Sequence, residues 1–224
     1  MRPWPGRCAV VADTGPAAIS VLAGVNGAGK SSLFGSLVEE SDATYVDPDA
    51  RTREILASEP QLTLTEANSR AWKAGRKLLH TAVENRESYA FETTLGGRSI
   101  AADLKAAAQV MPVRVWYVGL ASPEMHIQRV QARVAAGGHD IPEDKIRSRY
   151  ERSRINLIDL LPDLLELRVY DNSAEGDPKQ GQRPTPRLLL EMRAGRIVGS
   201  VDLDAAPDWA KPILAAALLL ESGA

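Results

Sequence analysis

The chain has 224 residues, of which 44% are hydrophobic and 25% charged, and its formal net charge is −2. These proportions are those of a globular protein with one main domain, and the small net charge provides no field that attracts nucleic acid. A single cysteine excludes an internal disulfide, and the longest apolar run near the C-terminus, residues 213–220, is too short to cross a membrane. We therefore expect a cytoplasmic protein without a membrane or nucleic-acid partner.

The first predicted elements form a phosphate-binding loop. Residues 1–17 contain three prolines and two glycines and are expected to be an N-terminal extension. Residues 18–23 predict a strand, residues 24–31 read Gly-Val-Asn-Gly-Ala-Gly-Lys-Ser, and residues 32–38 have apolar side chains at helical spacing. This order lets backbone N–H groups and a helix N-terminus hold a polyphosphate, with the lysine on the phosphates and the serine hydroxyl on Mg²⁺. The predicted nucleotide-binding residues are Gly24, Asn26, Gly27, Ala28, Gly29, Lys30, Ser31 and Ser32.

A pair of acidic residues follows the second predicted strand, residues 43–46, which Pro48 terminates. In a doubly wound sheet, Asp47 and Asp49 would lie beside the phosphate loop. A carboxylate there can accept a proton from an attacking hydroxyl or hold a water on Mg²⁺. Asp-Pro-Asp is equally typical of a simple turn, and the spacing does not separate the two interpretations.

The next helix, residues 62–86, has a capping-box pattern in Thr63 and Glu66. Residues 88–92 predict a third strand, and Glu92 again emerges at its C-terminal end. That carboxylate would bind sugar hydroxyls or the water shell of the metal. The alternative is an ordinary surface glutamate at a strand end.

The remaining pattern completes an α/β protein. We expect helices at residues 100–110, 123–136, 142–161 and 207–220, strands at 112–120 and 168–172, and a hairpin at 188–201 with its turn at Ala194-Gly195. Strands that alternate with helices predict a P-loop kinase-type parallel sheet with helices on both faces. Residues 18–185 would form this domain, with the hairpin and helix of residues 186–224 packed on it.

Arginines cluster around Gly137-Gly138. Arg129 and Arg133 share one helix face, and Arg147 and Arg149 follow on the next predicted helix. Mobile arginines beside a glycine hinge are typical of a lid that closes over a nucleotide and supplies cations to the transferring phosphoryl group. The alternative for any single arginine is that it has no catalytic role and lies on an ordinary solvent-exposed helix face, where it forms salt bridges.

The ordered set of motifs favours one class of phosphate-loop protein. A switch GTPase needs an Asn-Lys-x-Asp segment, which the sequence lacks. A motor or AAA-type ATPase is expected to have an apolar strand that ends in Asp-Glu and a larger oligomerising apparatus, and the sequence shows neither. A small-molecule kinase needs a base after the second strand, a substrate carboxylate after the third and an arginine-rich lid. The chain has all three in that order.

These motifs together resemble those of the zeta toxin family over about residues 18–175. The matching segments are residues 23–32, 47–49, 91–95, 137–143, 147–150 and 170–173. The segment Gly-Gly-His-Asp-Ile-Pro at 137–142 is typical of a shorter, zeta-like branch, whose members often lack an obvious antitoxin.

The resemblance implies a kinase that uses ATP and Mg²⁺ to phosphorylate the sugar 3′-hydroxyl of UDP-N-acetylglucosamine, with an antitoxin protein as a partner. It implies Lys30 on the phosphates, Ser31 on Mg²⁺ and Asp49 as general base. Glu92 and Thr94 would contact the sugar, and we expect Arg98 to contact the substrate as well. The catalytic arginines would be Arg129 and a second one from Arg133, Arg147 or Arg149.

Three alternatives keep the phosphate loop. The acceptor can be another nucleotide-linked metabolite or a nucleoside. The protein can be a nucleotide-binding regulatory module without an acceptor. A nucleic-acid kinase is disfavoured by the net charge of −2.

Overall fold

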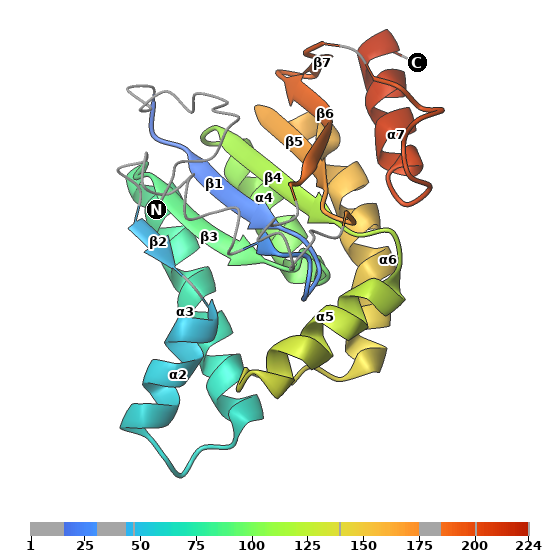
Figure 1. Ribbon diagram of the computed structural model, residues 1–224. Helices are drawn as coiled ribbons and strands as arrows, with labels where there is room; N and C mark the ends of the chain where they lie inside the picture. The colour runs from blue at the N-terminus through green and yellow to red at the C-terminus, as the bar shows by residue number, and fades with distance from the viewer. Residues whose placement is uncertain are drawn as a thin grey trace, which may run out of the picture.

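A computed structural model describes residues 16–30, 44–46, 48–138, 140–174, 185–199 and 201–223. The strands of these residues form one sheet in the order β2-β3-β1-β4-β5-β6-β7 (Figure 1). They are β1 Ile19–Ala23, β2 Thr44–Val46, β3 Tyr89–Thr93, β4 Val113–Gly119, β5 Glu166–Asp171, β6 Arg187–Arg193 and β7 Arg196–Ile197. The first five are parallel, and β6 and β7 continue the sheet in antiparallel fashion.

The centre of the sheet is formed by apolar strands because both of their faces are covered. In β1, Ile19, Val21 and Leu22 have no exposed surface. Ala23, the last residue of β1, lies opposite Thr93 of β3 and Tyr117 of β4. The loops that follow these three strands therefore share one edge of the sheet.

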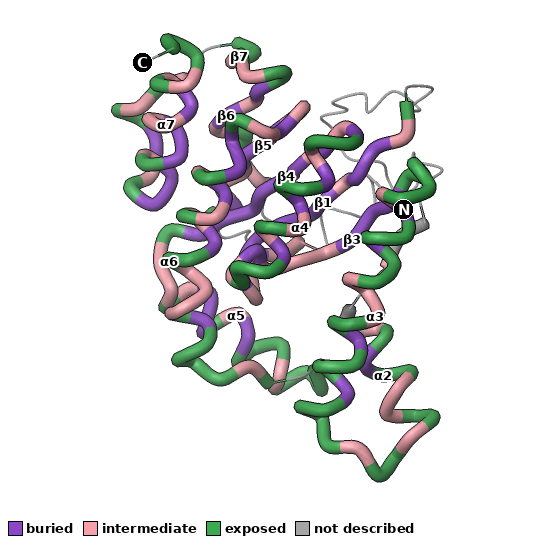
Figure 2. The backbone as a smooth tube through the Cα atoms, turned by 180° about the vertical axis from the view of Figure 1, so that it is seen from behind, coloured by how far each residue is buried: buried purple, intermediate pink, exposed green. Residues whose placement is uncertain are grey.

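The described helices are α2 Pro48–Ser58, α3 Leu64–Asn85, α4 Arg98–Ala108, α5 Pro123–Ala135, α6 Glu143–Leu160 and α7 Lys211–Ser222, with a short 3₁₀ helix η1 at Leu161–Asp163. Helices α3, α4, α6 and α7 share one hydrophobic core with the sheet. Figure 2 shows the buried residues concentrated along the strands and on the helix surfaces that face them. Helix α2 and the part of α3 that packs against it extend away from the sheet, and α5 lies beside α6 (Figure 1).

The α/β class, the capping box at Thr63 and Glu66, and the hairpin turn at Ala194-Gly195 are confirmed. Helix α2 was not predicted: β2 ends before Pro48, but Pro48 then opens a helix, because its fixed φ angle suits a first turn. Pro142 is the N-cap of α6 rather than its first helical residue. The last helix begins at Lys211, later than residue 207, and β7 is only two residues long. The predictions for residues 1–15 and for the helix at 32–38 lie outside the described residues.

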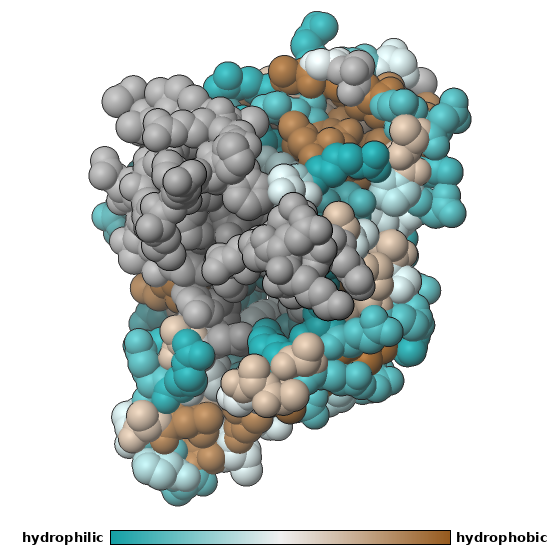
Figure 3. Space-filling model, in the orientation of Figure 1, coloured by the Kyte–Doolittle hydropathy of each residue, from teal (hydrophilic) through white to brown (hydrophobic). Residues whose placement is uncertain are grey.

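The C-terminal hairpin and α7 complete the core. Trp209 is buried against the end of β4, and its indole N–H donates to Oδ1 of Asp171 at the end of β5, 3.2 Å away. Apolar residues are exposed on this part of the molecule at Leu188, Val198 and Leu219. Figure 3 shows apolar surface there and around the α2–α3 connection.

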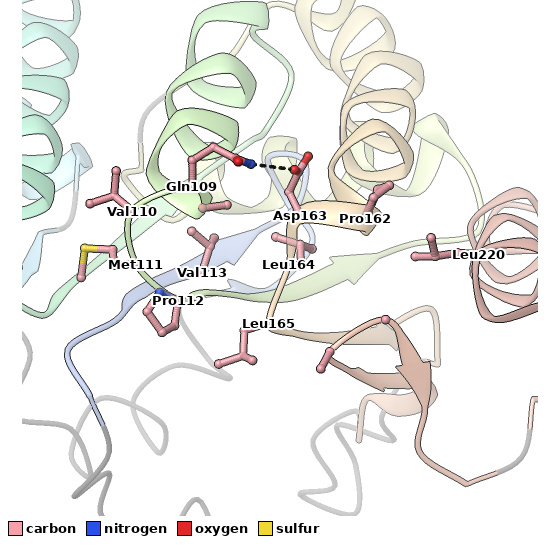
Figure 4. Close-up of a pocket in the computed structure, with 13 residues that line it drawn as sticks. Gln109, Val110, Met111, Pro112, Val113, Pro162, Asp163, Leu164, Leu165 and Leu220 are labelled. Carbon is pink, nitrogen blue, oxygen red and sulfur yellow. Dashed lines mark hydrogen bonds between the residues drawn. The ribbon is translucent and has the colours of Figure 1, made fainter. Parts of the chain in front are cut away.

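A pocket of about 430 Å³ lies at the edge of the sheet opposite the phosphate loop. It is bounded by the start of β4, by η1 and by the β6–β7 turn, and the side-chain amide of Gln109 donates to Asp163 at its rim (Figure 4). In the part of the chain that the structure describes, no helix has the length and apolar character needed to cross a membrane.

Candidate functional site

The phosphate loop leaves β1 and is shaped by its glycines. The N–H of Gly24 donates to the carbonyl of Thr93, which fixes the loop on β3. Gly24 has a φ of +145°, and a β-carbon there would lie 2.3 Å from the carbonyl oxygen of Val118. Gly27 has a φ of +82°, and its β-carbon would lie 2.7 Å from the carbonyl oxygen of His126. Only glycine fits this backbone between β4 and α5.

Lys30 spans the phosphate loop. Its ammonium donates to the carbonyl oxygen of Gly24 over 2.7 Å, so the cation lies across the loop. A positive charge held in this way attracts a polyphosphate. Ser31 and Ser32, the predicted Mg²⁺ ligand and its neighbour, lie outside the described residues. Among the residues that are described, no three His, Cys, Asp or Glu side chains form a metal-binding group.

Helix α5 supports the loop through a histidine that the sequence did not mark. Nδ1 of His126 lies 2.9 Å from the carbonyl oxygen of Asn26, so Nδ1 carries the proton of a neutral imidazole. Burial lowers the pKa of His126 to about 4, against the raising effect of this hydrogen bond, and Lys30 and Arg129 lower it further. The residue is therefore neutral near pH 7 and fixes the backbone of the loop.

Asn172, which lies in the matching segment 170–173 but was assigned no role, follows β5 and holds the loop from the other side. Its buried amide donates to the carbonyl oxygen of Ala28 over 2.8 Å. Nη2 of Arg129 donates to the backbone carbonyl of Asn172 over 2.9 Å. The predicted catalytic Arg129 is thus tied to the segment that packs against the loop. No local pattern predicts these contacts, because they join residues 43 or more positions apart.

The arginines predicted for the lid occupy different places. Nη1 of Arg149 donates to Oδ1 of Asn26 over 2.8 Å, which connects α6 directly to the phosphate loop. Burial lowers the pKa of Arg149 from its usual high range, but the guanidinium remains charged near neutral pH. Arg147 instead forms an exposed ion pair with Glu124. Arg133 lies at the end of α5, where its carbonyl accepts from the N–H of Gly138 and closes the predicted glycine cap.

The predicted base and acceptor residues lie at the same edge of the sheet as the loop. Asp49 is in the first turn of α2, just after β2, and β2 pairs with β3. Glu92 lies near the end of β3, half-buried and opposite Leu22 of β1. Thr94 follows β3, and Arg98 begins α4 with an exposed side chain. This edge of the sheet therefore brings together the phosphate loop, cationic residues and acidic residues.

A family model described as an AAA domain, AAA_33, matches residues 19–154, which is more than half of the chain. The chain belongs to the AAA_33 family. We expected from the sequence that the chain is not an AAA-type protein. The match corrects this expectation, because the family model is described as an AAA domain. The expectation rested on a strand ending in Asp-Glu, and no described strand of this AAA_33 protein ends in that pair. Family membership therefore does not depend on that feature.

One relative is an uncharacterized protein of Haemophilus influenzae, 33% identical over 128 residues, which are 57% of this chain and 88% of that protein. Among solved structures, the AvrRxo1-ORF1:-ORF2 complex with ATP has a TM-score of 0.59 at 13% identity and covers 92% of this chain and 64% of that one. The PezAT toxin-antitoxin system of Streptococcus pneumoniae has a TM-score of 0.54 at 15% identity, over 70% of this chain and 68% of that one. At these identities the likeness is one of fold, and it is the fold of P-loop kinases.

Proposed function

We propose that this AAA_33 protein is an ATP-dependent kinase that transfers the γ-phosphoryl group to a hydroxyl of a small molecule. The observation that carries the proposal is the placement of two cations on one loop. Lys30 donates to Gly24 at the start of the phosphate loop, and Arg149 donates to Asn26 inside it. Phosphoryl transfer depends on positioning and on cations around the equatorial oxygens, and the contacts of Lys30 and Arg149 with the loop support such a role for this edge of the sheet.

In the proposed reaction the loop N–H groups and Lys30 hold the β- and γ-phosphates of ATP. Asp49 takes the proton of the acceptor hydroxyl, whose oxygen attacks the γ-phosphorus as the bond to the ADP oxygen breaks. Arg129 and Arg149 would offset the charge that develops on the transferring group. Mg²⁺ bound with ATP, with Ser31 as its protein ligand, would neutralise phosphate charge.

The acceptor class follows from the resemblance to zeta toxins. We propose a UDP-amino sugar such as UDP-N-acetylglucosamine, with Glu92, Thr94 and Arg98 in contact with it. The fold likeness to the PezAT toxin-antitoxin system supports a relationship with toxins of this kind and names no acceptor. It also supports an antitoxin as the protein partner of a toxin that acts in the cytoplasm, where ATP and nucleotide sugars occur.

The second candidate is a nucleotide-binding regulatory module without an acceptor. The contacts of His126, Asn172 and Arg149 with the phosphate loop are those of a rigid binding site and do not require an acceptor. Such a protein would bind ATP and release ADP only slowly.

The test is mass spectrometry of the products after incubation of the protein with ATP, Mg²⁺ and a panel of UDP-sugars, nucleotides and free sugars. A phosphorylated UDP-N-acetylglucosamine supports both the reaction and the substrate. Phosphate on another member of the panel retains the kinase and replaces the acceptor. ATP binding without any phosphorylated product would support the regulatory module instead.

A further inference from the structure

One face of α6 contacts the loops at the edge of the sheet that carries the proposed active site. The contacts come from Arg149, Tyr150, Ser153 and Asn156, whose spacing places them along the same side of the helix. Arg149 reaches the phosphate loop, and the hydroxyl of Tyr150 donates to the carbonyl of Ala121 after β4 over 3.0 Å. The other two residues contact the segment after β3.

That segment, residues 94–97, has an unusual backbone. Leu95 is fully buried and has a φ of +52°, a left-handed backbone conformation that residues other than glycine rarely adopt. Such a conformation persists only where the surroundings impose it. The hydroxyl of Thr93, the last residue of β3, accepts from the N–H of Leu95 over 3.0 Å.

Two side chains of α6 hold this backbone from outside through hydrogen bonds. The hydroxyl of Ser153, a fully buried residue, donates to the carbonyl oxygen of Thr94 over 2.7 Å. The side-chain amide of Asn156 donates to the carbonyl oxygen of Leu95 over 2.7 Å and lies 3.4 Å from that of Gly97. Removal of either side chain would take a hydrogen bond from the backbone carbonyls that it contacts.

Close packing adds to these bonds. A β-carbon on Gly96 would lie 2.8 Å from Cγ of Arg149, so the segment rests directly on the arginine that binds the phosphate loop. The segment carries Thr94 and lies between Glu92 and Arg98, the three residues proposed to contact the acceptor. Helix α6 is thus a common support for the nucleotide loop and for the acceptor segment.

We propose that Asn156 is a positioning residue for the acceptor, which acts through Leu95 and Gly97 and sets the place of Thr94 and Arg98. Ser153 assists it at the carbonyl of Thr94. The inference rests on the proposed kinase function. It assigns to α6 a role in acceptor specificity that is separate from the contact of Arg149 with the nucleotide loop.

The test is Asn156→Asp, which keeps the size of the side chain but turns a carboxylate oxygen toward the carbonyl of Leu95. With the acceptor identified by the product screen, we expect the KM for the acceptor to rise about tenfold, because the half-buried hydrogen bond to the carbonyl of Leu95 is lost. The KM for ATP should change less than twofold. Asn85→Asp, the same change at the exposed end of α3, is the matched control and should leave both constants unchanged.

Hydrogen–deuterium exchange of the free protein separates this inference from the proposed function. We expect faster exchange in residues 94–98 of Asn156→Asp, with the phosphate loop unchanged. Equal rises in both KM values, or unchanged exchange in residues 94–98, would overturn the positioning role. If the unaltered protein phosphorylates no acceptor, the kinase proposal and the acceptor role fall together, and the exchange result still decides whether Asn156 holds the segment.

Discussion

Arg149 of α6 donates a hydrogen bond of 2.8 Å to Asn26 of the phosphate loop, although 123 positions separate the two residues. The contact places a half-buried guanidinium beside the proposed phosphate site. It also distinguishes Arg149 from Arg147, whose guanidinium forms an exposed ion pair with Glu124.

The first prediction concerns these arginines. We expect Arg149→Ala to lower the rate of phosphoryl transfer about 100-fold, because it removes a cation from the site of charge development. Arg147→Ala should lower it less. Arg152→Ala, an exposed change on the same helix, is the control and should have little effect. Steady-state kinetics with urea unfolding of each variant checks the order, and a larger effect of Arg147→Ala would contradict it.

The second prediction concerns the general base. Asp49→Asn should reduce phosphoryl transfer by about 10²-fold or more, because the amide cannot take the acceptor proton. ATP binding, measured by calorimetry, should be retained, because the phosphate loop is unaltered. Asp47→Asn is the matched control in the same acidic segment and should remain more active. An active Asp49→Asn enzyme would show that another group is the base.

The third prediction concerns pH and His126. Its pKa is lowered by burial to about 4 in the folded protein, against about 6.5 in an unfolded chain. The unfolded state therefore binds a proton first, so stability from this residue is complete above pH 6.5 and is lost as the pH falls toward 4. The shift corresponds to about 3 kcal/mol in the free energy of unfolding.

Urea unfolding at pH 7 and at pH 4.5 measures this dependence. His126→Gln, which has no titratable group, should show a smaller loss of stability over the same interval. Proton NMR should find the imidazole of His126 neutral at pH 5.5, and a charged imidazole there would contradict the assignment.

The fourth prediction compares the same substitution at two glycines. A β-carbon on Gly119 would lie 2.3 Å from the ring of Trp209, so Gly119→Ala should destabilise the protein by about 1–3 kcal/mol. Gly75 lies inside α3, and a β-carbon there would have no neighbouring atom within 4 Å, so Gly75→Ala should stabilise by about 0.5–1 kcal/mol. Urea denaturation measures both, and similar effects at the two sites would show that Trp209 is free to move.

The sequence was sufficient for the phosphate loop because that site is local. Its glycines, Lys30 and the preceding apolar strand are contiguous, and the structure places them as expected at the end of β1. The alternation of strands and helices likewise predicted the α/β class. Helix α2 was missed because a proline after a strand indicates the end of that strand, although proline also suits the first turn of a helix, which is the place of Pro48.

The rest of the site depends on tertiary contacts that carry no local signal. His126 looks ordinary in the sequence, and Asn172 lies in a segment that resembles a family motif but was given no role; the two fix Asn26 and Ala28 from different elements. Which arginine of the predicted lid reaches the loop depends on how α6 packs on the sheet. For the same reason, the hydrogen bond of Asn156 with the segment after β3 was not predictable.

Trp209 lies beyond the residues that the family model matches, yet it packs on the end of β4, which lies within them. The family match ends at residue 154, inside α6, whereas the indole of Trp209 bonds to β5 and packs on the end of β4. A protein trimmed to the matched residues would lose β5, the second half of α6 and the cover of the core. The hairpin and α7 thus cover the core beyond the matched residues, and changes there can alter the ends of β4 and β5.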